Sequence, residues 1–155
     1  MRRLMDNRGF TYLSLLFLIT VMGLAASAAG KAWSTGARRE MEEELIFRGS
    51  EIRRAIGRYY EESPGAKAYP RAIEDLIKDP RYPATKRHLR RLYSDPFTGK
   101  PDWGVIRTPE GWIIGVRPGS DKEPYKKGNF PKELAGLEGK TRYSEWEFAY
   151  YPEKK

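Results

Sequence analysis

Residue types that catalyse reactions or bind metals are scarce in this chain of 155 residues. It has one histidine, His88, and no cysteine, which excludes disulfide bonds, thiol catalysis and thiolate metal sites. His88 stands among cations and has no carboxylate neighbour in the sequence, so neither a zinc enzyme nor a Ser-His-Asp hydrolase has a basis. We therefore expect a surface histidine and no enzymatic activity.

The densest basic stretch, residues 81–91, has the composition of an anion-binding segment. Its candidate contacts are Lys86, Arg87, Arg90 and Arg91, with aromatic residues at Tyr82 and Tyr93. The formal net charge of +8 also suits anionic partners. Three interpretations remain open: contacts to DNA phosphates, contacts to lipid headgroups, and the solvated outer face of a small helix. The third requires the fewest assumptions, and nucleic acid is not the expected partner.

The element that must position everything else is the long N-terminal segment. Residues 9–30 contain no charge, whereas Arg2, Arg3 and Arg8 precede them. As a helix these residues are roughly 33 Å long, enough to cross a bilayer core of about 30 Å. From Trp33 the pattern becomes amphipathic and continues to a stop signal at residues 63–65. Its apolar positions recur at helical spacing: Trp33, Ala37, Met41, Leu45, Ile52, Ile56 and Tyr59. The sequence therefore predicts one helix from Phe10 to about Glu62.

Three interpretations of the apolar run compete. It is a plain single-span anchor with a cytoplasmic N-terminus, a secretory signal cleaved after Ala26-Ser27-Ala28, or a segment processed where the charge stops. The last alternative arises because Arg8 is followed at once by Gly9 and Phe10, and the apolar run begins without a spacer.

This junction resembles the signal of type IV pilins and type II secretion pseudopilins, in which a basic leader ends in Gly and Phe follows. The resemblance implies that a prepilin peptidase cuts between Gly9 and Phe10 and methylates the new amine of Phe10. It also implies that the helix is retained, first as an anchor in the bacterial inner membrane and later in the core of a filament. The C-terminal head would then lie in the periplasm.

Ser14 departs from the family pattern. The family usually has Glu at the fifth mature position, where it is thought to neutralise the terminal amine of a neighbouring subunit. An unpaired charge in an apolar core is costly, and a serine hydroxyl offers only a hydrogen bond. In this family the missing Glu is typical of a subunit at the filament tip, so Ser14 favours a minor or accessory subunit.

The remaining residues predict a small α+β head. Short helical patterns follow Pro70 and Pro83, and residues 103–107 and 112–117 form a predicted hairpin around a turn at 108–111. Residues 125–141 look like a surface loop with one helical turn. Alternation over residues 143–150 predicts a half-buried strand with Ser144, Trp146, Phe148 and Tyr150 on one face and Tyr143, Glu145 and Glu147 on the other. This strand and the hairpin would form an antiparallel sheet covering the stripe from Met41 to Tyr59.

The turn Asp95-Pro96-Phe97 ahead of this hairpin resembles the Asp-Pro-Trp-Gly segment of the major pseudopilin. In that family a Ca²⁺ site follows the hairpin, and the corresponding loop here offers Asp121 and Glu123. Calcium takes six to eight oxygens, so two carboxylates flanking Lys122, even with Asp102 folded close, are a poor start. A solvated turn is the expected outcome, and no other metal or cofactor is expected.

The sequence thus predicts a pilin-like α+β protein with four parts. These are a leader (1–9), a transmembrane or filament-core helix (10–30), the soluble half of the stem (31–62) and a periplasmic head (63–155). The resemblance implies a structural subunit of a type II secretion pseudopilus, with prepilin peptidase, other pseudopilins and the inner-membrane assembly platform as partners. The alternatives are a minor type IV pilin that contacts DNA and a plain single-pass anchored periplasmic protein.

Overall fold

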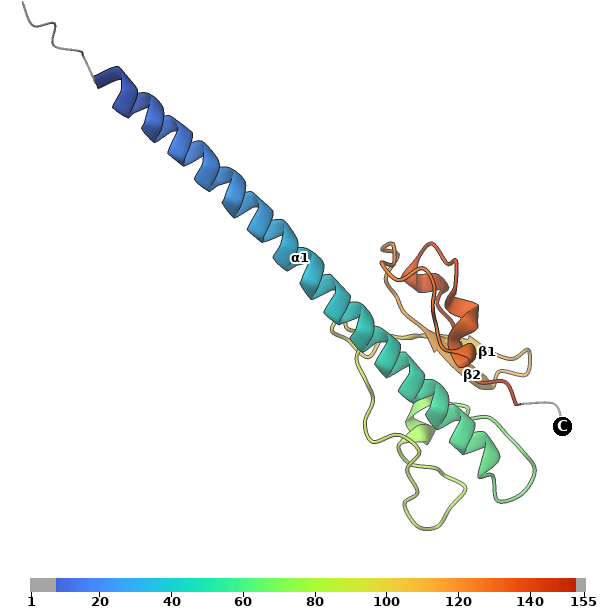
Figure 1. Ribbon diagram of the computed structural model, residues 1–155. Coiled ribbons are helices and arrows are strands. Elements are labelled where there is room, and N and C mark those ends of the chain that lie inside the picture. The colour runs from blue at the N-terminus through green and yellow to red at the C-terminus, as the bar shows by residue number, and fades with distance from the viewer. Residues whose placement is uncertain (1–7, 153–155) are drawn as a thin grey trace, which may run out of the picture. The chain divides into compact units, whose positions relative to one another are not determined.

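The computed structural model describes residues 8–152, and it describes side chains for residues 11–27 and 36–152. One α-helix, α1 (Arg8–Glu61), covers the segment for which a single helix was expected (Figure 1). It ends one residue before the predicted Glu62, ahead of Pro64 and Gly65. The chain divides between Arg39 and Glu40 into two compact units, which are described separately below.

The second unit is an α+β head, as expected, with few regular elements. It contains the C-terminal part of α1, three short strands and three 3₁₀ helices. These elements are η1 (Ile73–Leu76), β1 (Gly104–Arg107), β2 (Ile113–Arg117), η2 (Lys132–Leu137), η3 (Tyr143–Glu145) and β3 (Phe148–Ala149). The helical pattern after Pro70 is therefore confirmed as one 3₁₀ turn, η1. The pattern predicted after Pro83 is wrong, because residues 83–93 contain no helix.

The predicted hairpin is confirmed. β1 pairs antiparallel with β2, with Val105 opposite Val116, and β2 pairs antiparallel with β3, with Val116 opposite Phe148. At the turn, the Thr108 N–H donates to the Trp112 carbonyl over 2.8 Å, and Gly111 takes a positive φ of 89° that favours glycine. The sheet order is β1-β2-β3.

One stripe of α1 forms the centre of the head core. Leu45, Ile52, Ile56 and Tyr59 are all buried, at positions that the helical spacing predicted. The N-terminal end of the predicted stripe is wrong, since Met41 is 41% exposed and its neighbour Glu42 is buried instead. Glu42 accepts hydrogen bonds from the Tyr125 and Lys126 N–H groups and from the Tyr143 hydroxyl, over 2.8, 2.9 and 2.6 Å. These three donors offset the cost of burying a carboxylate.

The C-terminal segment packs differently from the predicted strand. Strand β3 is limited to Phe148 and Ala149, and the Tyr150 N–H also donates to the Ile114 carbonyl of β2 over 2.8 Å, whereas Tyr143 to Glu145 form η3. Tyr143 was assigned to the outer face, yet it is buried between the rings of Phe97 and Trp146, with centroids 4.6 and 5.0 Å away. A 3₁₀ turn has three residues per turn, so Tyr143 and Trp146 share one side. The predicted surface loop before it also contributes core residues, Leu134 and Leu137.

β3 lies directly against α1. A Cβ atom added to Gly49 would stand 2.5 to 2.6 Å from three atoms of the Phe148 ring, so only glycine fits there. The Arg53 Nε also donates to the Ala149 carbonyl over 2.9 Å. The sheet therefore covers α1 at residues 49–53, which confirms the expected packing of sheet on helix.

This close approach gives a stability prediction. We expect Gly49→Val to lower the free energy of unfolding of the head by about 3 kcal/mol, because the new side chain overlaps the buried Phe148 ring. The measurement is urea denaturation of the whole chain in detergent, followed by the fluorescence of the buried Trp103 and Trp146. Gly36→Val is the matched control, since nothing lies within 4 Å of its Cβ position. Equal midpoints for the two variants would contradict the packing described.

Candidate functional site

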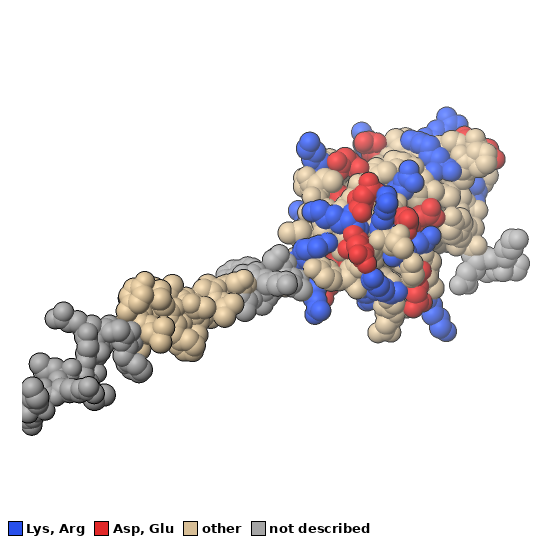
Figure 2. Space-filling view, turned by 90° about the horizontal axis from the view of Figure 1, so that it is seen from above, with Lys and Arg blue, Asp and Glu red and all other residues tan. Residues whose placement is uncertain are grey.

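The most unusual surface of the protein is the N-terminal part of α1. Its described residues, 11–27, are all exposed and include no Lys, Arg, Asp or Glu, as Figure 2 shows by the tan stretch between two grey ones. Ten large apolar side chains are 44–71% exposed. They are Tyr12, Leu13, Leu15, Leu16, Phe17, Leu18, Ile19, Val21, Met22 and Leu24. Removing each from water would contribute on the order of 1 kcal/mol, so this surface favours an apolar environment.

The residues at which the resemblance predicts processing lie at the start of this helix. Gly9 and Phe10 belong to the first turn of α1, although their side chains lie outside the described residues, as do residues 1–7 of the expected leader. Ser14 is exposed on the second turn. The Thr20 hydroxyl donates to the Leu16 carbonyl over 2.8 Å, so this polar group is satisfied within the helix.

Within the part of the chain that the structure describes, no helix combines the length and the apolar character needed to cross a membrane.

The basic segment is irregular and contains neither helix nor strand. The N–H groups of His88 and Leu89 both donate to the Leu76 carbonyl over 2.8 Å, which fixes the segment beside η1. Lys86 forms an ion pair with Glu62 over 2.8 Å and lies 4.4 Å from the centre of the Tyr82 ring. Its hydrogen bond lowers the pKa of the Glu62 carboxyl.

The four proposed phosphate contacts therefore do not form one set of free cations. Arg87 and Arg90 are exposed, Arg91 lies over the Tyr93 ring at 5.4 Å, and Lys86 is paired. Since phosphate binding requires available cations, this arrangement offers less than the sequence indicated.

The prediction for His88 is wrong. The residue is 3% exposed, and its Nε2 lies 2.9 Å from Oδ2 of Asp79, which is completely buried. Asp79 also accepts two side-chain hydrogen bonds from Arg81, over 2.8 and 2.6 Å. Sequence reasoning missed this cluster because the carboxylate stands nine positions before the histidine. In the structure residues 79–82 form a turn in which the Tyr82 N–H donates to the Asp79 carbonyl.

The Asp79 cluster holds the end of α1. Arg81 donates through Nη2 to the Tyr59 carbonyl over 2.8 Å and through Nη1 to the Ser63 hydroxyl over 2.6 Å. Its guanidinium also lies 3.5 Å from the centre of the Tyr59 ring. The last turn of a helix leaves carbonyls without intrahelical partners, so this arginine supplies a missing donor. The hydrogen bonds of this cluster therefore give it a structural role at the end of α1.

The calcium candidates are not brought together. Asp121 accepts a hydrogen bond from the Ser144 hydroxyl over 2.6 Å, Glu123 pairs with Lys127 over 2.6 Å, and Asp102 accepts from the Thr98 hydroxyl over 2.6 Å. Within residues 11–27 and 36–152, no group of three or more His, Asp or Glu side chains is placed to hold a metal ion.

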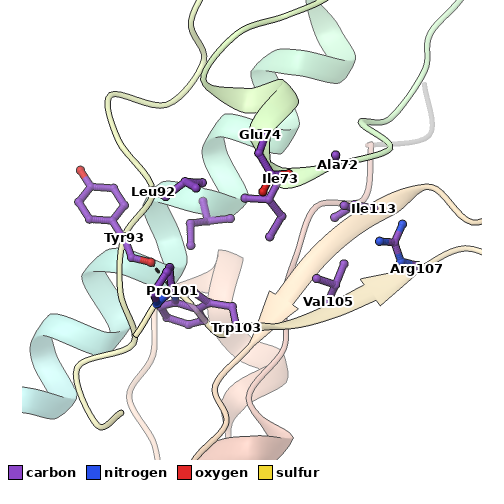
Figure 3. A pocket seen from close by; sticks show the side chains of 11 residues that line it. Ala72, Ile73, Glu74, Leu92, Tyr93, Pro101, Trp103, Val105, Arg107 and Ile113 are labelled. Carbon is purple, nitrogen blue, oxygen red and sulfur yellow. Dashed lines mark hydrogen bonds between the residues drawn. The ribbon is translucent and has the colours of Figure 1, made fainter. Parts of the chain in front are cut away.

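A cavity of about 240 Å³ lies where η1, the hairpin and α1 meet (Figure 3). Its walls are mostly apolar, from Ile52 of α1, Val105 of β1 and Ile113 of β2. The charged wall residues are Glu74 and Arg107, and Arg107 already donates to the carbonyls of Arg71 and Gly111. The Trp103 indole N–H at the cavity also donates, to the Tyr93 carbonyl over 2.8 Å. Arg107 and the Trp103 indole are engaged with backbone carbonyls, so the cavity offers shape and apolar surface more than reactive groups.

Comparison with family models, curated proteins and solved structures yields no match to this chain, so its function is argued from its residues and their geometry.

The Asp79 cluster gives a pH prediction. Burial alone would raise the pKa of Asp79, but hydrogen bonds from Arg81 and His88 outweigh it and lower the pKa from 3.8 to about 2. The resulting stability is present above pH 3.8 and is lost as the pH falls through about 2. We expect this carboxyl to contribute about 2 kcal/mol to the fall in unfolding free energy between pH 5 and pH 2, as denaturation at each pH would measure.

Asp79→Asn should lack that component and should already be less stable at pH 7 by about 3 kcal/mol, because half-buried Arg81 loses its carboxylate partner. Asp102→Asn is the control at pH 7, since that exposed carboxylate meets the Thr98 hydroxyl at the surface. If both variants had wild-type stability at pH 7, the structural role assigned to Asp79 would be wrong.

Proposed function

We propose that this chain is a pilin-like structural subunit of a type II secretion system, which assembles into or initiates a periplasmic pseudopilus. The observation that carries the proposal is the change of character along a single helix. Residues 11–27 of α1 are apolar and exposed, whereas Leu45 to Tyr59 of the same helix form the core of a folded head. A helix of this kind suits a subunit whose N-terminal part is covered by something other than its own head.

Lipid and other copies of the same helix are the two coverings that fit residues 11–27. Both are apolar, and neither requires charged partners. Small residues support close packing between copies, since Gly23 and Ser27 stand four positions apart, and a Cβ at Gly23 would meet nothing within 4 Å. The proposed sequence of events is insertion in the bacterial inner membrane, with the head in the periplasm, followed by extraction into a filament core.

The start of α1 supplies the second line of support. Gly9 and Phe10 fall at the junction of the basic leader and the apolar run, where the resemblance places cleavage and N-methylation. Ser14 brings no carboxylate to neutralise the Phe10 amine of a neighbouring subunit, which favours an initiating or minor subunit. The partners under this proposal are prepilin peptidase, other pseudopilins and the inner-membrane assembly platform.

Under this proposal the activity is mechanical. Subunits added at the membrane lengthen the filament, and the filament pushes secreted proteins through the outer-membrane channel. The head presents a surface and holds its shape, which agrees with the roles of buried Glu42 and Asp79 in holding loops and the end of α1. A minor type IV pilin would have the same processing and the same helix. The two alternatives differ in whether the subunit assembles with a type II secretion system or with a type IV pilus.

The proposal predicts a defined N-terminus. Mass spectrometry of the chain extracted from bacterial membranes should give a mature protein that begins at Phe10 and carries one additional methyl group. A chain that still begins at Met1 would indicate the plain membrane anchor. A chain that begins near Ala29 would indicate a cleaved secretory signal, and either result would overturn the proposal.

Two glycine variants test whether the processing depends on the junction. Gly9→Val should prevent cleavage and leave the leader attached, because the resemblance places glycine immediately before the cut. Gly23→Val makes the same chemical change at a helical position with open space around it, and should leave processing intact. Cleavage of both variants to the same extent would show that a different enzyme removes the leader.

A further inference from the structure

Strand β1 forms one edge of the sheet, since the strand order is β1-β2-β3. Within the described part of the chain, the backbone of β1 pairs with no segment other than β2. The residues of β1 are half-buried or exposed, whereas three residues of β2 are buried. The opposite edge is covered, because Arg53 of α1 donates to the Ala149 carbonyl over 2.9 Å. The open edge of the sheet is therefore the one at β1.

The register shows which backbone groups of β1 point outward. The Tyr150 N–H donates to the Ile114 carbonyl over 2.8 Å, so the backbone of Ile114 faces β3. Backbone groups alternate in direction along a strand, so those of the next residue, Gly115, face β1. Gly115 is paired with Ile106, and the residue before it, Val105, then points its N–H and C=O away from β2. Val105 thus offers one donor and one acceptor to a strand laid beside it.

The cavity described above lies on the same side of β1 as the Val105 side chain. Val105 and Trp103 both line it, and Ile73 of η1 lies across the cavity from them (Figure 3). Its volume of about 240 Å³ exceeds the about 150 Å³ of an engineered apolar cavity that holds benzene. The cavity therefore has room for one bulky apolar side chain that arrives along the edge of β1.

The geometry of antiparallel pairing fixes which side chains of an added strand could enter. Residues directly opposite each other share one face of the sheet. A residue opposite Val105 would therefore direct its side chain toward the cavity. The two neighbours of that residue would lie on the other face of the sheet, next to Gly104 and Ile106.

That other face carries a cation with no partner. Arg117 of β2 is paired with Gly104, and a Cβ atom on this glycine would stand 2.8 Å from Cγ and 3.0 Å from Nε of Arg117. The arginine side chain therefore lies across β1, in space that only glycine leaves open. Arg117 is exposed, and among the described residues it forms no hydrogen bond or ion pair. Its guanidinium is available to an acidic side chain beside the open edge.

Charge on the two faces sets the phase of a matching segment. Exposed Glu74 stands at the cavity, so an acidic residue on that face would meet a like charge. An acidic residue on the other face would meet Arg117 instead. The formal net charge of +8 adds attraction for an acidic partner at longer range.

We propose that the outer edge of β1 binds an extended segment of a partner protein in which bulky apolar residues alternate with acidic residues. The segment would add a fourth strand to the sheet through the N–H and C=O of Val105. One apolar side chain would fill the cavity, and a neighbouring carboxylate would pair with Arg117. The proposal goes beyond the proposed function and does not rest on it, because every residue that it uses lies within Glu40–Lys155.

A second copy of β1 fits this edge less well than an acidic segment. Antiparallel pairing of two β1 strands about Val105 would place the Arg117 side chains of both copies on one face of the joined sheet, and like charges there are unfavourable. Short edge strands flanked by cations, as β1 is by Arg107 and Arg117, are also typical of edges protected against self-pairing. The partner expected here is therefore a different chain with acidic side chains.

Two fluorescein-labelled, capped heptapeptides of identical composition test the alternating pattern. The alternating probe is Ser-Glu-Phe-Glu-Val-Glu-Ser, and the scrambled probe is Ser-Glu-Glu-Phe-Val-Glu-Ser, which places its two apolar residues on opposite faces. Fluorescence anisotropy measures the binding of each to the full chain in phosphatidylcholine nanodiscs. We expect the alternating probe to bind at least tenfold more tightly. Equal affinities, or no binding of either probe, would overturn the proposal.

A charge exchange tests the contact with Arg117. Arg117→Glu should weaken binding of the alternating probe at least tenfold, because its glutamates then meet a carboxylate. The same variant should bind a probe with lysine in place of every glutamate at least tenfold more tightly than the unmodified chain does. Arg87→Glu makes the same change at an exposed arginine outside the site and should alter binding less than twofold. Equal losses in the two variants would show that only overall charge attracts the probe.

Hydrogen exchange of single amides, measured by NMR, tests the added strand without any substitution. The Val105 N–H should exchange at least tenfold more slowly when the alternating probe saturates the chain. The Ile106 N–H already faces β2 and should change less than threefold. A Val105 amide that does not respond to the bound probe would show that no strand is added. Strong protection of this amide in the free chain would show that the edge is already covered, and either result would overturn the proposal.

The two proposals of this article fail separately. A chain that still begins at Met1 but binds the alternating probe would overturn the proposed function and leave the β1 site in place. A chain that begins at methylated Phe10 but binds neither probe would overturn the β1 site and leave the proposed function in place.

Discussion

Burial of one stripe of α1 is the interaction on which the head depends. The sheet has strands of four, five and two residues, and a sheet of this size needs a helix to pack against for stability. Leu45, Ile52 and Ile56 supply that surface, and Phe148 approaches so closely that only glycine fits at position 49. The same helix, α1, also carries the apolar residues 11–27, so one helix supplies both the core of the head and the apolar N-terminal segment.

Buried carboxylates hold the irregular loops of this head in place by accepting hydrogen bonds from their N–H groups. Glu42 holds the loop at Tyr125 and Lys126, Asp79 holds Arg81 and His88, and Asp95 accepts from the N–H groups of Phe97 and Gly119 over 2.8 and 3.1 Å. Each satisfies backbone or side-chain donors that would otherwise be buried without partners. Long irregular connections are thereby fixed at a few points over the core.

Patterns with a local physical cause were predictable from the sequence. The hairpin followed from its turn residues, and the end of α1 followed from Pro64 and Gly65. The burial of Leu45 to Tyr59 followed from helical spacing. What failed depends on partners distant in sequence. Alternation placed Tyr143 outside, but its hydroxyl reaches Glu42, 101 positions earlier, and draws the ring into the core.

Partners distant in sequence also limited what could be predicted for the candidate site. Gly9, Phe10 and Ser14 were proposed from their position at the edge of an apolar run, which is a local signal, and their roles stay a prediction. Residues 11–27 are exposed in the structure of the single chain. His88 and Lys86 were misjudged because their partners, Asp79 and Glu62, reach them only through the fold. The composition likewise shows how many basic residues there are, but only the structure shows that some of them, such as Lys86, already form ion pairs within the chain.

The bond from Arg81 to the Tyr59 carbonyl has a consequence for motion. The final turn of a helix normally frays, and its amide protons then exchange rapidly with solvent deuterons. Here a guanidinium fastened to a buried aspartate restrains that turn, so slow deuterium uptake should persist to the last residues of α1. The end of α1 that lies inside the head is thus held in its helical form by a side chain from a loop more than 20 residues later.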